Sequence, residues 1–402
     1  MSPRQRNILI FILGFIAMLG PLSIDMYLPG FKAIASDLNT DISQVSLTLT
    51  SYFIGISLGQ LFYGPLLDRY GRIKPMLFGI SLYLLAAAGS ALAPTIEWLI
   101  GARFFMALGG CSGMVATRAI IRDRFDGNEI ARVFSTLILI MGVAPIIAPT
   151  LGGYVVAHFG WRSIFIILTG IALVMLFLIY SVLQESKAID RSVSLRLKPV
   201  MRGYWEVLRN PQFLLYGIAG SLGMAGLFTY ISGSPFVLME KFGLNETTYG
   251  WVFGSNAAFF IIGSQINNQV LKNNDSQKVT LISGAGLLAV GIFIAIATYF
   301  RLLSPWGYIG LLMGFMFCLG FVNPNTMALS LMPFVRNAGM ASALNGSLRM
   351  LSGAIASGLM GLFHNGTIVP MFSIMAAFAI LVFVLVIWAH QKQRTMALAN
   401  TA

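Results

Sequence analysis

Twelve apolar stretches, each long enough to cross a lipid bilayer, run through the 402 residues of the chain. A helix needs roughly 20 predominantly apolar residues to span the hydrocarbon core of a membrane. Hydrophobic residues make up 57% of the sequence and charged residues only 10%, which is too little charge for the surface of a soluble protein. We therefore predict an all-α membrane protein with spanning helices at residues 8–30, 43–65, 75–93, 97–120, 130–157, 163–183, 211–233, 247–268, 278–300, 304–327, 338–361 and 367–390.

The distribution of Lys and Arg sets the expected orientation. With the N-terminus inside, nineteen of the 26 basic residues fall on the cytoplasmic side, four on the external side and three within spans. Cytoplasmic loops of membrane proteins carry such an excess of positive charge. We therefore expect both termini in the cytoplasm, and the net charge of +12 requires no nucleic-acid partner.

The sequence divides into two similar halves. Its longest polar interval, 184–210, predicts an N-terminal six-helix bundle at 1–183, a cytoplasmic linker at 184–210 and a C-terminal six-helix bundle at 211–402. Within the linker we expect a short amphipathic helix near 200–208. Small residues spaced by four recur in spans 2 and 8, and again in spans 5 and 11. Such residues let helices approach closely, and we expect them to pair span 2 with span 11 and span 5 with span 8 in a duplicated fold.

The loop after the second span carries a spaced set of glycines and charges. The stretch GPLLDRYGR fits the pattern G-x-x-x-D-R-x-G-R and resembles the loop motif of the major facilitator superfamily. We expect Asp68 to face the positive N-terminal end of a neighbouring helix and Arg72 to reach Asp123 on the adjacent loop. The alternative is an ordinary solvated pair of loop charges. The resemblance implies two pseudo-symmetric six-helix bundles and a conformational latch made of Gly64, Asp68, Arg69, Gly71, Arg72 and Asp123.

The fifth span contains a second motif, APTLGG. It resembles the G-P-x-x-G-G motif of the superfamily's antiporters, with Ala148 in place of the first glycine. Pro145 and Pro149 each remove a helical hydrogen-bond donor and bend the helix, while Gly152 and Gly153 permit close packing. The resemblance favours export over uptake, and the alternative is a generic kinked helix.

Asp25 is the only one of the 14 acidic residues that lies inside a predicted span. Arg103 fits the buried arginine found in the fourth span of drug exporters and lies at a similar depth, although Met106 replaces the usual supporting glutamine. A charge near the middle of a spanning helix costs ~2.5–3.5 kcal/mol. An isolated Asp25 would therefore tend to be neutral, whereas a nearby Arg103 would favour its charged form. A carboxyl group between these influences can load and release a proton.

The sequence around Asp25 resembles one branch of this superfamily in particular. SIDMYLP, together with RDRF, GWRSIF and SGSPFV, resembles the bicyclomycin and chloramphenicol resistance (Bcr/CflA) branch of the drug:proton antiporters. In that branch the aspartate of D-x-Y-L-P is linked to proton coupling or substrate recognition, and the match places this role on Asp25. The alternative is that Asp25 only caps a helix break before Pro29.

A drug-sized apolar pocket with few polar anchors is expected between the bundles. In the second half, Arg349 is the only charge within a span, where it either holds a polar ligand group or bonds to freed backbone carbonyls. The 272–278 loop stands where a second loop motif would lie and lacks its G-R pair, so any second latch is degenerate. The candidate proton-coupling residues are Asp25 and Arg103, and the candidate substrate-binding residues are Asp25, Tyr27, Tyr52, Arg103, Phe228, Trp251, Asn345 and Arg349.

These observations predict a proton-coupled exporter of small, moderately apolar compounds such as chloramphenicol- or bicyclomycin-like drugs. We expect it to act by alternating access, as a monomer, in the inner membrane of a bacterium. The alternative is a proton-coupled symporter for a nutrient, and a channel is disfavoured because no filter-like segment is repeated. An enzyme is not expected, since no span offers a nucleophile with a base and no phosphate-binding loop occurs. Two Cys and three His form no metal-ligand cluster, so neither metal nor cofactor is expected.

Overall fold

The computed structural model describes residues 3–125, 127–190, 197–334 and 338–401, and within these ranges every regular element is a helix. Backbone N–H and C=O groups find no water in hydrocarbon, so a spanning chain satisfies them inside helices. Ten helices among the described residues are long and apolar enough to cross a membrane. These ten match predicted spans. The predicted eighth and eleventh spans form α11 (Glu246–Val270) and α14 (Ala338–Leu362), which are 25 residues long but carry more polar side chains.

The first spanning segment is broken into short pieces: α1 (Pro3–Ala17), α2 (Leu19–Asp25), a 3-10 turn (Leu28–Gly30) and α3 (Phe31–Asp37). Pro21 and Pro29 explain both interruptions, because proline has no N–H to donate to the carbonyl four residues earlier. Those carbonyls belong to Ala17 and Asp25, the last residues of α1 and α2. The predicted break before Pro29 is therefore present, and Asp25 lies at its edge.

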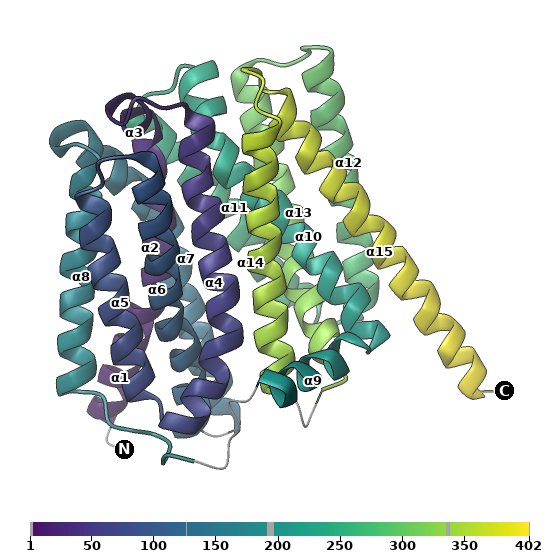
Figure 1. Ribbon diagram of the computed structural model, residues 1–402. Helices are drawn as coiled ribbons and strands as arrows, with labels where there is room; N and C mark the ends of the chain where they lie inside the picture. The colour runs from purple at the N-terminus through teal and green to yellow at the C-terminus, as the bar shows by residue number, and fades with distance from the viewer. Residues whose placement is uncertain (1–2, 126, 191–196, 335–337, 402) are drawn as a thin grey trace. The chain divides into compact units, whose positions relative to one another are not determined.

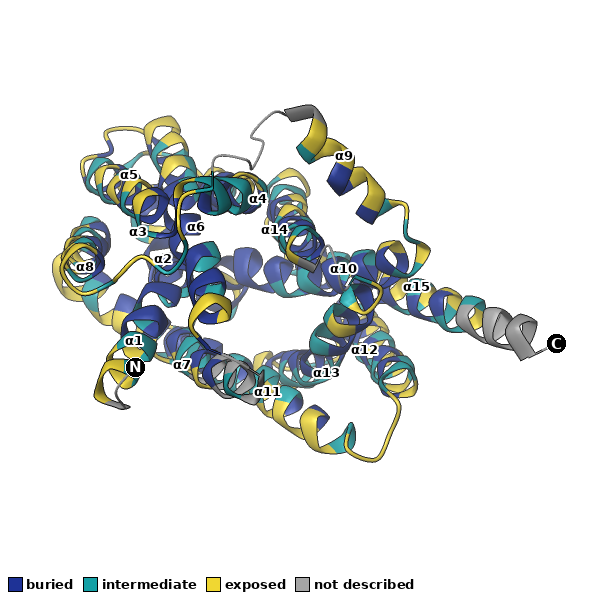
Figure 2. Ribbon diagram, turned by 90° about the horizontal axis from the view of Figure 1, so that it is seen from below, coloured by how far each residue is buried: buried dark blue, intermediate teal, exposed yellow. Residues whose placement is uncertain are grey.

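The remaining helices of the first half are α4 (Ile42–Tyr70), α5 (Ile73–Ala91), α6 (Ile96–Arg124), α7 (Gly127–Phe159) and α8 (Arg162–Ser181). Helix α6 packs against α4 and α5, α5 packs against α8, and α7 packs against α1 and α2. Figure 1 shows α4, α5, α6 and α8 running side by side. Figure 2, which views the helices end-on, shows that α6 is more buried than α8. Helix α6 is thus the central element of this half.

The small residues of span 2 pack differently from the prediction. A methyl group on Gly55 would lie 2.8 Å from Cβ of Ala107, and one on Gly59 would lie 2.8 Å from Cβ of Cys111. Both contacts are with α6, so the expectation that this ridge faces span 11 is wrong. The ridge serves the α4–α6 packing instead, because two helix backbones approach closely only where side chains are small.

The second half repeats the neighbour pattern of the first. Its helices are α10 (Pro211–Ser234), extended by a π-helical turn (Pro235–Lys241), α12 (Ser276–Tyr299), α13 (Pro305–Leu331), α14 and α15 (Val369–Thr401). Helix α12 packs against α13 and α15, as α5 packs against α6 and α8, and α10 packs against α13 and α14. Gly320 of α13 lies against the backbone of Ser264 in α11, the counterpart of the α4–α6 contact. This recurrence confirms two pseudo-symmetric bundles.

The chain forms two compact units, residues 1–200 with 244–254 and residues 201–243 with 255–402. The start of α11 thus belongs to the first unit, where Gly250 lies against Thr150 and Gly254 against Ile146 of α7. This is the expected contact of span 8 with span 5. The expected linker helix is α9 (Leu197–Leu208), while linker residues 191–196 lie outside the described ranges. The limits 1–183, 184–210 and 211–402 stay a prediction.

Candidate functional site

Asp25 occupies a buried position at the broken end of α2. Its exposed fraction is 5%, and that of Tyr27, two residues further on, is 0%. The hydroxyl group of Tyr27 is 2.8 Å from that of Thr48 in α4, and the hydroxyl of Ser23 is 2.6 Å from that of Tyr83 in α5. These hydrogen bonds hold the broken segment against its neighbours, so the position of Asp25 is fixed by the residues on either side of it.

Arg103 of α6 is completely buried and lies among aromatic rings. Its Nη1 donates to the backbone carbonyl of Ser23 at 2.9 Å. The guanidinium carbon is 4.6 Å from the ring centre of Tyr27 and 4.2 Å from that of Tyr52. An arginine over an aromatic face is stabilised by the ring quadrupole, most strongly where water is absent. The structure therefore brings three predicted residues, Tyr27, Tyr52 and Arg103, into one cluster.

The expected pairing of Asp25 with Arg103 is not formed. No ion pair joins the two side chains in the part of the chain that the structure describes. Nε and Nη2 of Arg103 have no hydrogen-bond partner among the described residues, and Sδ of Met106 lies 3.8 Å from Nη1. The carbonyl of Ser23 and the rings of Tyr27 and Tyr52 thus stabilise the positive charge of Arg103. Asp25 forms no ion pair with this charge. The depth of each residue could be read from the sequence, but the direction of its side chain could not.

The APTLGG motif packs directly onto the segment that follows Asp25. Pro145 and Pro149 lie inside α7, as predicted. A methyl group on Gly152 would lie 2.9 Å from Cα of Met26, and one on Gly153 would lie 2.8 Å from the backbone oxygen of Glu246. Both approaches require residues without a side chain. The antiporter-like motif therefore sets the position of the backbone next to Asp25.

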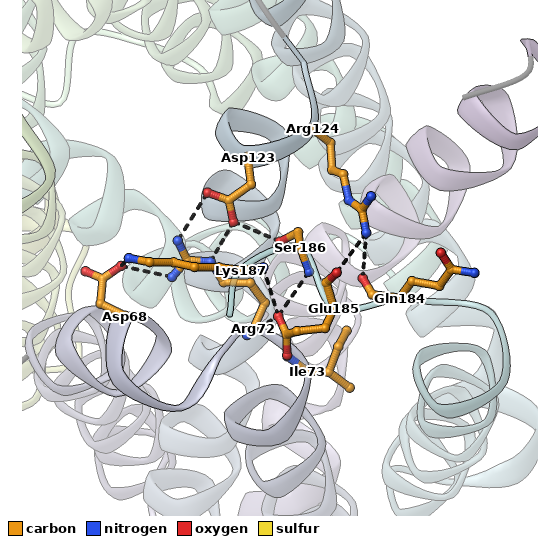
Figure 3. A network of polar contacts seen from close by, with 9 residues as sticks. All are labelled: Asp68, Arg72, Ile73, Asp123, Arg124, Gln184, Glu185, Ser186 and Lys187. Carbon is orange, nitrogen blue, oxygen red and sulfur yellow. Dashed lines mark hydrogen bonds and ion pairs between the residues drawn. The ribbon is translucent and has the colours of Figure 1, made fainter. Parts of the chain in front are cut away.

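A network of charged side chains joins the ends of α4, α5 and α6 to the start of the linker (Figure 3). Arg72 donates from Nε and Nη2 to the two oxygens of Asp123, at 2.8 and 3.2 Å, and from Nη1 to Asp68 at 3.0 Å. Burial lowers the pKa of Arg72, but the hydrogen bonds and charges of Asp123 and Asp68 outweigh it and raise this pKa above its ordinary value. The guanidinium group is therefore charged, and the expected contact of Arg72 with Asp123 is present.

The linker supplies residues of this network that the sequence reasoning missed. The Glu185 carboxylate accepts hydrogen bonds from the backbone N–H of Arg72 at 2.7 Å and of Ile73 at 3.1 Å. Ser186 donates to Asp123 at 2.8 Å, and Lys187 pairs with Asp68 at 3.0 Å. We call the network residues Asp68, Arg72, Asp123, Glu185, Ser186 and Lys187 the charge network. The sequence feature that could have indicated them is the run of an acidic, a hydroxyl and a basic residue, Glu185, Ser186 and Lys187, directly after the predicted sixth span and Gln184.

The structure corrects the expected role of Asp68. The residue that faces the positive N-terminus of α5 is Glu185, whereas Asp68 contacts Lys187 and Arg72. Unpaired N–H groups at a helix start favour a carboxylate acceptor. Gly71 leaves room for Glu185 to reach these N–H groups. Its φ of 83° favours glycine, and a methyl group at this position would lie only 2.5 Å from Oε2 of Glu185.

The other two members of the loop motif contribute less to this packing. Arg69 accepts a hydrogen bond from the backbone N–H of Asp190 at its own backbone oxygen, at 3.1 Å. At Gly64, no atom of the described chain lies within 4 Å of the position that a methyl group would take, so packing does not require glycine there. The role of these residues as a latch stays a prediction.

The remaining candidate residues fall in different places. Phe228, buried in α10, contacts Gly353 of α14. Arg349 donates to Oδ1 of Asn345 at 2.7 Å and to Oδ1 of Asn323. Both acceptors are oxygens of uncharged amide groups. These residues belong to the second unit. Trp251 belongs to the first unit and its side chain is exposed. Their part in a substrate pocket stays a prediction.

The family model of the Major Facilitator Superfamily matches residues 13–357. The chain belongs to this superfamily. It is 30% identical over 379 residues to a bicyclomycin resistance protein homolog of Haemophilus influenzae, with 93% of this chain and 94% of the relative covered. It is also 30% identical over 307 residues to a chloramphenicol resistance protein of Pseudomonas aeruginosa, with 75% and 71% covered. These relatives confirm the expected Bcr/CflA resemblance.

The fold has close counterparts among solved structures. A bacterial homologue of the human lysosomal transporter Spinster superimposes with a TM-score of 0.76, covers 98% of both chains and is 14% identical in sequence. At this identity the likeness concerns the fold alone. The major facilitator fold expected from the loop motif is confirmed.

We predict that Gly152→Ala will displace the segment after Asp25. The added methyl group meets the backbone of Met26, which cannot yield as a flexible side chain can. Transport should fall at least about tenfold, because a small misplacement of a reacting group costs that much or more. The measurement is drug accumulation in proteoliposomes. Gly170→Ala in α8 is the control, since no described atom lies within 4 Å of its methyl position. Equal losses in both variants would contradict the contact.

A second prediction concerns Glu185→Ala. Loss of a carboxylate at a helix N-terminus costs about 1 kcal/mol. The backbone amides of Arg72 and Ile73 should then exchange their hydrogen with solvent several-fold faster, as measured by hydrogen–deuterium exchange and mass spectrometry. Glu206→Ala, which removes only an exposed pair with Arg202, is the control. Unchanged exchange at residues 72 and 73 would show that Glu185 does not cap α5.

Proposed function

We propose that the protein is a proton-coupled exporter of small, moderately apolar drugs, with Asp25 as the residue that carries the proton. It works by alternating access in the inner membrane of a bacterium, with both termini in the cytoplasm. Three observations support this proposal. Two relatives are named for resistance to bicyclomycin and to chloramphenicol, the chain carries the APTLGG motif, and it belongs to a family of transporters.

The observation that carries the proposal is the environment of Asp25. The carboxyl group is buried at a helix break and has no ion pair with Arg103 within the described chain, and Gly152 of the antiporter-like motif lies against the backbone of the next residue, Met26. A buried acid without a cation favours the neutral form. When the surrounding helices move and water or a cation reaches it, the charged form is favoured and the proton leaves. One carboxyl group can thus couple a proton to each change of access.

Arg103 acts in this proposal on the rest of the cluster. Its contacts with the carbonyl of Ser23 and the ring of Tyr27 lie on both sides of Asp25 in the chain. A shift of α6 therefore moves the segment that carries the carboxyl group. The aromatic rings supply apolar surface of the kind that drug-sized pockets use.

The charge network is proposed to be the latch of one access state. It ties α4, α5 and α6 to the linker through a buried arginine with two acidic partners. Removing an acidic partner would leave the buried charge of Arg72 less compensated, which is costly and suits a contact that must hold one conformation. None of its residues needs to touch the substrate.

The Asp25→Asn variant tests the proposal in proteoliposomes loaded with an acidic buffer. The wild-type protein should accumulate radiolabelled chloramphenicol against its gradient until a proton ionophore dissipates the pH difference. Asp25→Asn should still bind the drug with a Kd within about threefold of wild type, but accumulation should fall more than about tenfold, because the amide cannot carry a proton. Asp41→Asn, at the start of α4, is the control.

Two results would contradict the proposal. Accumulation by Asp25→Asn at the wild-type rate would remove Asp25 from the coupling. Accumulation only in vesicles with an alkaline lumen would indicate a symporter, the alternative that the sequence left open.

A further inference from the structure

A cavity of about 430 Å³ lies at the end of the first unit that carries the N-terminus, between α1, α6 and the residues that follow α8. Its lining contains no residue of the Asp25 cluster or of the charge network, although Arg124 and Gln184 in the lining lie next to that network. Its lining includes Ile8, Ile12, Ile120, Arg124, Ser181 and Leu183.

The cavity is amphipathic. Ile8 and Ile12 recur at helical spacing on one face of α1, and Ile120 of α6 and Leu183 complete an apolar wall. Arg124 lies one helical turn beyond Ile120, at the polar end of α6. The cavity therefore offers apolar surface next to a cation, a combination that fits an amphiphile with a negative head group.

Arg124 has donors available for such a head group. Its Nη2 donates to the backbone oxygens of Gln184 at 3.3 Å and Glu185 at 2.9 Å (Figure 3). Nε and Nη1 make no hydrogen bond within the described residues. Arginine binds phosphate oxygens through two parallel N–H groups, which makes it well suited to this ligand.

The depth of the cavity matches the inner surface of the membrane. It lies at the start of α1 and the end of α6, which the distribution of basic residues places on the cytoplasmic side. On α1 beside it, Ile8 and Phe11 are 42% and 68% exposed. Exposed apolar side chains at this level face lipid, so molecules of the inner leaflet can reach the cavity.

We propose that this cavity binds one anionic phospholipid of the inner leaflet, with its phosphate on Arg124 and the upper part of an acyl chain along Ile8, Ile12 and Ile120. Basic pockets between helices on the cytoplasmic side suit anionic head groups. Free phosphate would leave the apolar wall unused, and a zwitterionic lipid would bring a cation towards Arg124. The bound lipid also holds Arg124 in the position from which it grips the start of the linker, next to Glu185.

The experiment measures lipid retention by native mass spectrometry of the purified full-length protein. The probes are short-chain phosphatidylglycerol and phosphatidylcholine of the same chain length. Wild type should retain one phosphatidylglycerol and about tenfold less phosphatidylcholine. Arg124→Gln should lose this preference, whereas Arg122→Gln, an exposed arginine on the same helix outside the lining, should keep it.

A second variant separates the cavity from its charge. Ser181→Trp places a bulky side chain in the lining without removing a cation, and the hydrogen bond that it removes among the described residues is to the serine's own helix. It should lower retention of phosphatidylglycerol about as much as Arg124→Gln does. Equal retention by wild type and Arg124→Gln, or equal loss in Arg122→Gln, would overturn the proposal.

Discussion

The missing N–H of Pro29 determines how the first half of this transporter places its buried acid. An α-helix in hydrocarbon satisfies every backbone carbonyl, and a proline removes the donor that the carbonyl of Asp25 would have used. Helix α2 therefore ends at Asp25 and the chain continues through a 3-10 turn. The break lets Gly152 of α7 approach the backbone of Met26, and it turns Tyr27 towards Arg103. The proposed proton carrier Asp25, the contact of the antiporter-like motif and the aromatic cluster thus depend on one backbone interruption.

The charge network shows how a loop motif can depend on residues far away in the sequence. Asp68 and Arg72 are part of the motif, but their positions are completed by Glu185 and Lys187, which lie more than a hundred residues later. The linker thus does more than join the two halves, since it binds the start of α5 through Glu185. Arg124 holds the same linker segment from α6 and lines the cavity proposed to bind lipid. The proposed lipid would therefore contact, through Arg124, the same linker segment that completes the charge network.

Much of this architecture could be predicted from the sequence, because hydrophobic length and proline position act locally. The spans and the break before Pro29 follow from such local rules. The pairing of Arg72 with Asp123 is not local, and it could be predicted because the loop motif and the predicted topology place both residues on neighbouring loops of one side. The direction of the Arg103 side chain could not be predicted, since it depends on Tyr27, Tyr52 and a carbonyl brought together by packing. The partner of Gly55 was also predicted wrongly, because a small-residue ridge shows that a helix is close and not which helix it is. Glu185 was missed because a linker acid gives no periodic signal.

We propose that drug binding moves the helices around Asp25, so that its carboxyl group releases its proton without Arg103 as a fixed counter-ion. The most direct test of this proposal is the number of protons released when purified protein in weak buffer binds a drug, followed with a pH indicator. We expect release of about one proton per bound drug by wild type and none by Asp25→Asn with the same drug bound. Equal proton release by the two proteins would place the coupling on another residue and remove Asp25 from the mechanism.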